Sequence, residues 1–350
     1  NSLFLGVEHE LLVCSNSLIQ VFSPSGDQTL KESVSMTSPT LNSAGAYTVV
    51  YDVGGQQLRL VHGSKLVSKL ELASDESLLC ATVNEKGWMA VTSKASGYKA
   101  VVTVYNPSFE SVLSIRLSSR YISDAVVTPD CRGVYLVAPG QSGGAFENTL
   151  LYYTFSSKDT PTKTLSLGSN VVLSILSSGK CWILGDQSLL ILDSSCNISA
   201  SYDYAGQYLK MGTLQGDNFA TLLLSRSSSG GSGTLVTVDA GGDVCGQLDL
   251  EGQTMGLAAQ GDTVALLTTG ELITSDRKLD KYRSIPNQRG VRNLAVYEDG
   301  SIALVGSATV SLYFPSGSKI TNETEKVEET PEPAETTAPA EDTKNPETTM

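Results

Sequence analysis

Few residues of this chain have side chains suited to catalysis. His9 and His62 are the only two histidines among the 350 residues. A Ser–His–Asp or Cys–His arrangement would have to be assembled around one of them. Two histidines so far apart also exclude a histidine-rich metal site. We therefore expect both to be structural or surface residues.

Carboxylate pairs offer another route to hydrolysis, because glycosidases use two acids roughly 5–10 Å apart. Six aspartates stand in turn-like contexts, where Asp accepts hydrogen bonds from nearby backbone amides. They are Asp52, Asp130, Asp186, Asp193, Asp203 and Asp262. We interpret them as turn residues, and a carbohydrate-active hydrolase or lyase with acids lining a central channel stays open as an alternative.

The sequence shows no motif for a cofactor or a metal ion. It contains no G-K-[ST] phosphate loop, no D-x-D-x-D-G calcium loop and no C-x-x-C pair. Trp88 and Trp182 stand in apolar runs, so we expect them in the core rather than around a quinone cofactor. We therefore expect no catalytic residues, no metal and no cofactor, and thus a protein that is not an enzyme.

The six cysteines are widely spaced, and we expect them to be free thiols. Cys14, Cys80 and Cys181 stand in apolar strand patterns, where cysteine acts as a small buried hydrophobic residue. Cys131 and Cys196 fall in turns, so we expect these two to be more exposed.

A polar turn between two apolar runs recurs along the chain and predicts how these residues are positioned. Its seven instances lie at residues 42–45, 84–87, 130–133, 177–179, 215–217, 260–262 and 298–300. Their spacing of about 38 to 47 residues is typical of propeller blades with four short strands. β-branched residues with period-two alternation recur, and no sustained helical stripe is present. The sequence predicts an all-β fold, a β-propeller.

We predict about eight four-stranded blades, with seven as the alternative. The modules cover residues 2–36, 38–72, 76–118, 121–167, 171–203, 207–250, 254–286 and 290–320. The last module lacks an apolar fourth strand, and a strand upstream of Asn1 could supply that edge. Residues 1–320 thus form the predicted propeller. Residues 321–350 hold four Pro, eight Thr and nine acids, and we expect a disordered acidic tail.

Charge and hydropathy limit the partners. The net charge is −13, but the tail holds nine acids against two lysines, so the remainder is only mildly acidic. A body without a basic cluster argues against binding nucleic acid. No apolar run reaches the roughly 18–20 residues of a membrane span. The chain starts at Asn1 without Met, so we expect that an upstream segment, a cleaved signal or a membrane anchor, has been removed.

Three Gly/Ser-rich stretches indicate where a ligand would bind. Residues 93–99, 138–148 and 225–234 fall between the second and third strands of modules three, four and six, so we expect three long hairpin loops on one face. Per-repeat insertions of this kind often mark the binding face of a propeller. The candidate contacts are Tyr98, Lys99, Phe146, Glu147 and Arg226. Aromatic residues and arginine in small polar loops are typical of protein or glycan recognition.

The stretch from residue 49 to 136 resembles an uncharacterised propeller family of Gram-positive anaerobes, a domain of unknown function loosely similar to quinoprotein-like and WD-repeat propellers. The matching elements are YD-x-GG at 51–55, SGYK-x-x-VTVYN at 96–106 and SS-x-YI…V-TPD-x-RG at 118–133. Members of that family look like membrane proteins with one N-terminal helix and the propeller outside the cytoplasm. The resemblance thus implies an anchored, extracytoplasmic cell-surface protein, and it supplies no activity or cofactor.

These observations favour a non-enzymatic binding or scaffold propeller at the cell envelope. Its expected partner is an envelope protein or a cell-wall glycan, bound through the face that carries the three hairpin loops. We expect a monomer that meets the membrane only through the missing N-terminal segment. A structural assembly module that uses the tail and the outer strands is the second alternative.

Overall fold

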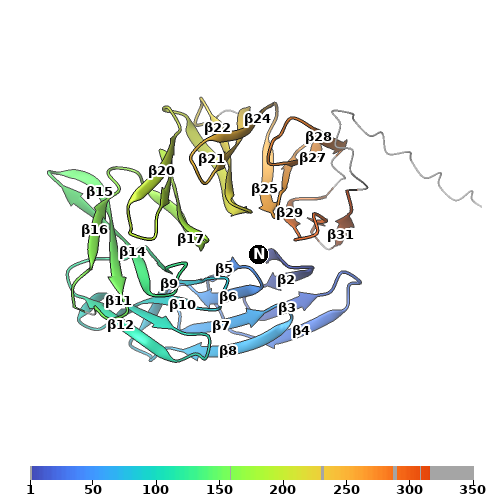
Figure 1. Cartoon of the computed structure of the whole chain (residues 1–350). Coiled ribbons are helices and arrows are strands. Elements are labelled where there is room, and N and C mark those ends of the chain that lie inside the picture. Colours follow the sequence, from blue (N-terminus) through green and yellow to red (C-terminus); the bar gives the residue numbers. More distant parts are fainter. Residues whose placement is uncertain (1, 158, 230–231, 287–289, 308, 316–350) are drawn as a thin grey trace, which may run out of the picture.

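The computed structural model describes residues 2–315 apart from 158, 230–231, 287–289 and 308. These residues form eight antiparallel sheets arranged as blades around a common centre (Figure 1). Seven sheets have four strands, and three strands of the eighth are described. The predicted all-β propeller with eight blades is therefore confirmed. The predicted tail and the proposed fourth strand of the last blade lie outside the described residues.

The strands follow one another along the chain. Blades 1 and 2 contain β1 (Leu3–Val7), β2 (Glu10–Cys14), β3 (Leu18–Phe22), β4 (Gln28–Ser33), β5 (Pro39–Ala44), β6 (Tyr47–Asp52), β7 (Gln57–His62) and β8 (Lys65–Glu71). Blades 3 and 4 contain β9 (Ser77–Val83), β10 (Met89–Ala95), β11 (Tyr98–Tyr105), β12 (Ser111–Leu117), β13 (Asp124–Val127), β14 (Gly133–Ser142), β15 (Ala145–Thr154) and β16 (Lys163–Ser166).

The second half of the ring repeats this arrangement. Blades 5 and 6 contain β17 (Val172–Ser178), β18 (Lys180–Gly185), β19 (Ser188–Leu192), β20 (Ile198–Asp203), β21 (Tyr208–Gly216), β22 (Phe219–Ser225), β23 (Gly233–Asp239) and β24 (Val244–Leu250). Blades 7 and 8 contain β25 (Thr254–Gln260), β26 (Thr263–Thr268), β27 (Glu271–Asp276), β28 (Tyr282–Pro286), β29 (Asn293–Val296), β30 (Ile302–Val305) and β31 (Val310–Tyr313).

Each blade is a meander whose first strand lies innermost. First strands of neighbouring blades contact one another, as β9 contacts β13 and β25 contacts β29, and β1 contacts β29 where the ring closes. All seven turns recognised in the sequence join the first and second strands of blades 2 to 8. The predicted module bounds agree with the strands to within a few residues, because the turn that ends each first strand has its own sequence signature.

The core lies between the blades. All seven residues of β22 are buried, because its two faces pack against different neighbours. Leu222 and Leu224 pack with Leu189 of blade 5. Phe219 and Leu223 pack toward blade 7 instead. Side chains alternate between the two faces of a strand, so a strand between two blades is apolar throughout and loses the in–out alternation of a half-exposed strand.

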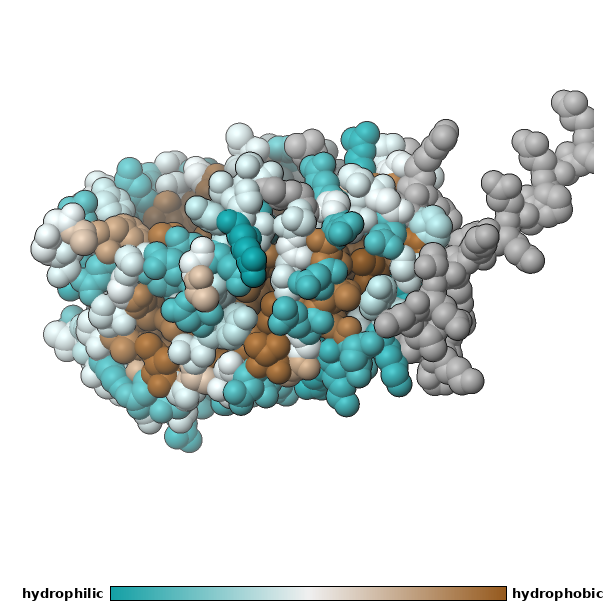
Figure 2. Space-filling model, turned by 90° about the horizontal axis from the view of Figure 1, so that it is seen from above, coloured by the Kyte–Doolittle hydropathy of each residue, from teal (hydrophilic) through white to brown (hydrophobic). Residues whose placement is uncertain are grey.

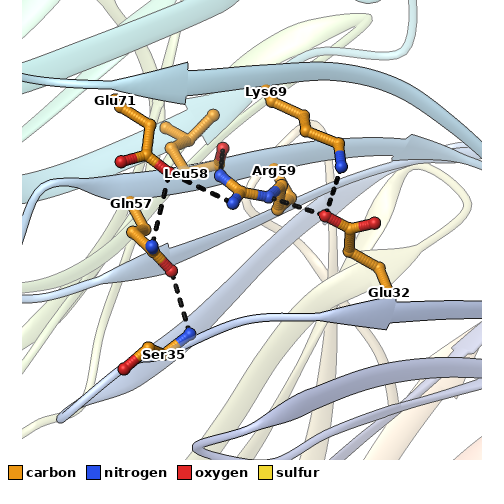
Figure 3. Close-up of polar contacts among 7 residues, drawn as sticks. All are labelled: Glu32, Ser35, Gln57, Leu58, Arg59, Lys69 and Glu71. Carbon is orange, nitrogen blue, oxygen red and sulfur yellow. Dashed lines mark hydrogen bonds and ion pairs between the residues drawn. The ribbon is translucent and has the colours of Figure 1, made fainter.

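An ion-pair network joins the outer parts of blades 1 and 2 (Figure 3). Arg59 of β7 is 5% exposed. Its Nε lies 3.2 Å from Oε1 of Glu32 in β4, and its Nη2 lies 3.3 Å from Oε1 of Glu71. Lys69 Nζ lies 2.6 Å from the same Glu32 oxygen. The network thus pairs a nearly buried guanidinium with two carboxylates, one of them from the neighbouring blade.

The cysteines are all unpaired thiols. Cys14, Cys80 and Cys181 are buried as predicted, and Cys131 is half-buried. The prediction for Cys196 was wrong, because this residue is fully buried. Its backbone has a φ of 59° in the turn after β19, and its side chain joins the core cluster that contains Cys181. A turn position therefore does not imply an exposed side chain. Trp182 is buried as predicted, whereas Trp88 is half-buried against the core.

Candidate binding face

The two faces of the ring differ in the connections that they carry. One face, here called the turn face, carries the links from first to second and from third to fourth strands. The opposite face, here called the hairpin face, carries the links from second to third strands and the crossings between blades. The sequence analysis assigned the binding residues to the hairpin face, and the strand order places all five there.

Two of the three expected loops are in fact continued strands. Ser96 and Gly97 alone link β10 to β11, and Gly143 and Gly144 alone link β14 to β15. The pairing of β14 with β15 runs to the Ser142–Ala145 pair, so this hairpin projects as a ribbon (Figure 1, green). Both of its turn glycines have positive φ, as tight hairpin turns require. The third stretch, 225–234, includes residues that are not described.

Tyr98 and Lys99 lie together at the β10–β11 hairpin. Tyr98 is 38% exposed, and the guanidinium carbon of Arg116 lies 5.9 Å from the centre of its ring. Lys99 Nζ lies 4.8 Å from the centre of the Tyr121 ring and donates a hydrogen bond to the carbonyl oxygen of Ser119 at 3.3 Å. These contacts stabilise two aromatic rings at the surface by cation–π attraction.

The other predicted residues occupy separate places on the same face. Phe146 is 43% exposed near the tip of the β14–β15 ribbon. The neighbouring Glu147 accepts a hydrogen bond from the hydroxyl of Ser166. Arg226 lines a different hollow, in blade 6. The structure therefore brings Tyr98 and Lys99 together, places Phe146 and Glu147 on the next blade, and leaves Arg226 apart.

Further apolar residues on this face escaped the sequence analysis. Eight of the twelve exposed large hydrophobic residues of the described chain lie in or directly beside hairpin turns or blade crossings: Val53, Tyr98, Tyr121, Phe146, Val171, Leu173, Tyr208 and Val310. Tyr121 and Leu173 are 57% and 56% exposed. None of the twelve falls in the turns between first and second strands, within the described part of the chain. The sequence carried a signal for four of these residues: Tyr121, Val171, Leu173 and Tyr208 all stand at or near the start of a predicted module, where the chain crosses between blades.

Seen from above Figure 1, the molecular surface shows brown apolar areas interrupted by teal hydrophilic residues (Figure 2). Of the remaining exposed hydrophobic residues, Val67, Ile198 and Val244 lie on fourth strands at the rim of the ring, and Phe314 follows the third strand of blade 8 on the turn face. These rim residues come from different blades and stand singly. Isolated exposed hydrophobic residues are normal, whereas a set gathered on one face marks an interaction surface.

The turn face holds two hollows of its own. One of about 410 Å³ is lined by turns of blades 3, 4 and 5 and includes Glu85, Lys86 and Lys180. Both lysines are engaged, since Lys86 Nζ donates to the carbonyl of Pro129 and Lys180 Nζ to that of Ala240. The other, of about 450 Å³, lies around the axis and shares Glu85 with the first.

Most predicted turn aspartates do cap backbone amides. Asp52 accepts hydrogen bonds from the amides of Thr37 and Ser38, at 2.9 and 2.6 Å. Asp193 accepts two from its own turn, which hold its pKa below the usual range. Asp130, Asp186 and Asp203 each accept a hydrogen bond from a backbone amide as well. Asp262 differs, because it pairs with Arg277.

One acid that the sequence analysis missed lies on an inner strand. Burial raises the pKa of Asp124, at the start of β13, to about 7. Its carboxylate accepts a hydrogen bond from the amide of Ala125 at 2.9 Å and lies beside the thiol of Cys80, whose own pKa burial also raises. Among the described residues no second carboxyl has its pKa raised as far. A two-acid hydrolytic site would pair such an acid with an ionised carboxylate nearby, and the groups that shift the pKa of Asp124 are the Ala125 amide and the Cys80 thiol, with no described carboxylate among them.

Neither histidine belongs to a cluster of possible metal ligands within the described residues. His9 is mostly exposed, with Nδ1 3.6 Å from Asp299, and His62 packs at 4.3 Å from the Tyr47 ring. Over the residues that the structure describes, no three His, Cys, Asp or Glu side chains are grouped so that they could hold a metal ion. Within the same residues, no helix is long and apolar enough to cross a membrane.

Comparison with known families identifies the chain. Residues 2–284 match the model of a family described as "Family of unknown function (DUF5711)". The chain belongs to this family. The match confirms the resemblance to an uncharacterised propeller family, and it covers blades 1 to 7. No curated protein matches the chain.

Solved structures with the same fold are WD40-type propellers and related proteins. The C-terminal WD40 domain of Sif2 superposes with a TM-score of 0.61 at 14% identity, over 89% of this chain and 97% of that domain. Kluyveromyces lactis Hsv2 gives a TM-score of 0.50 at 10% identity, over 77% and 89% of the two chains. At such low identity these similarities establish for this DUF5711 protein a WD40-like fold and no more.

Proposed function

We propose that the protein is a non-enzymatic binding scaffold of the cell envelope that holds a protein partner on its hairpin face. The observation that carries this proposal is the set of exposed apolar side chains on that face in blades 3 to 5. Tyr121, Phe146 and Leu173 are each more than 40% exposed, and they project from a crossing, a ribbon and an inner strand of successive blades.

A rigid ring is well suited to this role. Its core packs between blades, so surface residues at blade crossings and hairpins can vary without loss of the fold. Aromatic side chains supply large contact areas and have few rotatable bonds to immobilise, and they are enriched among the residues that dominate binding energy. A hydrolase of this kind pairs an acid of raised pKa with an ionised carboxylate, and no described carboxylate is among the groups that shift the pKa of Asp124, which supports binding over catalysis.

The location outside the cytoplasm is also a proposal. It follows from the resemblance of residues 51–55, 96–106 and 118–133 to an envelope family. Brief protease treatment of intact cells that produce the protein tests it. A surface protein is cleaved before a cytoplasmic marker, whereas protection until the cells are lysed would contradict the proposed location.

Affinity capture with matched variants tests the binding face. The face variant carries Tyr121→Ser, Phe146→Ser and Leu173→Ser, and the rim variant carries Val67→Ser, Ile198→Ser and Val244→Ser. Each removes three exposed hydrophobic side chains. A partner captured from solubilised envelope by the wild type and the rim variant, but reduced at least about tenfold with the face variant, supports the proposal. Equal capture by all three proteins would refute it.

A further inference from the structure

A polar hollow of about 550 Å³ lies on the hairpin face beside Tyr98. It is bounded by the β10–β11 hairpin on one side and by the crossing from blade 2 to blade 3 on the other. Its walls include Gln56, Asp75, Lys94, Ser96, Tyr98 and Lys99. The volume falls within the roughly 300–1,000 Å³ of ordinary ligand sites.

The composition of this hollow differs from that of a site for an apolar ligand. Small-molecule pockets are usually lined by several hydrophobic side chains with a few polar groups. Here Tyr98 is the only large apolar side chain, and serine, glutamine, aspartate and lysine side chains make up most of the rest. Such walls offer both hydrogen-bond donors and acceptors. They match a ligand that carries many hydroxyl groups around a compact ring.

Tyr98 is placed to act as a flat platform in this hollow. Arg116 lies 5.9 Å from the centre of its ring and restrains it, and 38% of the residue remains exposed. The aromatic face carries negative charge density and attracts partial positive charge, such as that of the C–H groups along one face of a pyranose ring.

Two charged side chains of the hollow are available to a ligand. Asp75 and Lys94 are both exposed and line the same walls. Neither makes an ion pair or side-chain hydrogen bond with the rest of the described chain, whereas Gln56 donates to the carbonyl of Glu76 at 3.1 Å. The two lysines and the two acids Asp75 and Glu76 balance in charge. A neutral ligand therefore suits the hollow better than a polyanion.

We propose that this hollow binds a neutral saccharide unit of a glycan. Tyr98 stacks against the C–H face of the sugar ring, Asp75 accepts hydrogen bonds from its hydroxyls, and Lys94 donates to them. This inference rests on the proposed role of the hairpin face in binding and adds a second class of ligand to that face. The hollow lies apart from the site proposed for the protein partner, because the apolar residues of that site lie mainly in blades 4 and 5 and at the crossing before blade 4.

The test uses the purified protein and a printed array of neutral and anionic oligosaccharides, followed by calorimetric titration with the neutral oligosaccharide that is retained best. Tyr98→Ala should weaken that affinity about tenfold, and Tyr98→Phe should keep it within about threefold because the ring remains. Asp75→Asn should weaken it through the lost charge-assisted acceptor. Tyr208→Ala, which removes an exposed tyrosine of the same face in blade 6, should leave it unchanged.

Three outcomes would overturn the inference: no retention on the array, retention of anionic oligosaccharides alone, or equal affinity of the wild type and Tyr98→Ala. Capture of the protein partner by the Tyr98→Ala variant is measured in parallel. If the sugar does not bind but the partner is still captured through Tyr121, Phe146 and Leu173, the saccharide site fails while the protein-binding role stands.

Discussion

The side-chain amide of Gln215 donates a hydrogen bond of 3.2 Å to the backbone carbonyl oxygen of Ser43, although 172 residues separate them. Gln215 belongs to blade 6 and Ser43 to blade 2, which stand opposite each other in a ring of eight. Ala44, next to Ser43, joins the core cluster of blades 5 and 6. The hydroxyl of Ser178 likewise bonds to Glu85 of blade 3. The centre of the ring is thus bridged at the turn face by contacts between blades that are far apart in the sequence.

Removal of this bridge should destabilise the ring. Gln215→Ala leaves the buried Ser43 carbonyl without its partner, and we expect a loss of about 1 kcal/mol in the free energy of unfolding. Urea unfolding followed by intrinsic fluorescence measures it. Gln141→Ala, at an exposed position of the β14–β15 ribbon, is the control and should change stability by less than about 0.5 kcal/mol. Equal stability of the two variants would show that the bridge contributes nothing.

The ion-pair network of Arg59 should stabilise the contact between blades 1 and 2. Arg59→Ala removes a nearly buried guanidinium and leaves Glu32 with Lys69 alone, so we expect destabilisation by about 2 kcal/mol. Glu71→Gln removes the more exposed partner and should cost less than about 1 kcal/mol. Thermal unfolding of both variants measures which substitution destabilises the protein more. A larger effect of Glu71→Gln than of Arg59→Ala would contradict this account.

Asp124 should make stability depend on pH. Its pKa is about 7 in the folded protein, against about 3.9 in an unfolded chain. The folded state therefore binds more protons between those values, and the stability of the wild type should fall as the pH rises from about 4 through 7. Asp124→Asn keeps an acceptor for the Ala125 amide and removes the charge, so it should be more stable than the wild type at pH 8, by up to about 4 kcal/mol.

Denaturant unfolding of the wild type and Asp124→Asn at pH 5 and pH 8 measures this effect. The stability advantage of Asp124→Asn should be larger at pH 8 than at pH 5, by about 2 to 3 kcal/mol. A difference that is independent of pH would show that Asp124 ionises normally in the folded state.

The burial of the cysteines predicts how thiols react in the native protein. Only Cys131 and Cys245 are partly exposed, so an aromatic disulfide reagent should label no more than these two quickly, and the other four only after unfolding. Mass spectrometry of the labelled peptides assigns the sites. Rapid labelling of Cys196 in the native state would contradict its position in the core between blades 4 and 5.

The fold was predictable from the sequence because each blade repeats a turn with its own signature. Asn84, Asp130 and Glu298 begin such turns, and the spacing between the turns indicated about eight blades, with seven as the alternative. The burial of Cys196 could not be foreseen, since the direction of a side chain in a turn depends on its φ, which is 59° here. The Gln215–Ser43 bridge could not be predicted either, because it joins residues of two opposite blades and no local sequence pattern indicates that contact.

The binding residues were predictable only in part. Gly/Ser-rich composition located the hairpins of Tyr98 and Phe146 correctly, although it suggested loops where the structure has paired strands. Tyr121 and Leu173 were missed because candidates were taken only from the Gly/Ser-rich stretches between second and third strands, whereas these two residues stand at or beside blade crossings. Asp124 was missed for a related reason, since its raised pKa comes from burial between inner strands that are distant in sequence.

The claim that the hairpin face binds a partner can be tested most directly by site-specific photo-crosslinking in cells. A photoreactive phenylalanine derivative replaces Phe146 or Tyr121 on the hairpin face, or Ile198 or Val244 on the rim, all of which are exposed. The account predicts crosslinked adducts of one defined size from the two hairpin-face positions and none from the rim. Adducts from the rim positions alone, or with equal yield from all four, would contradict it.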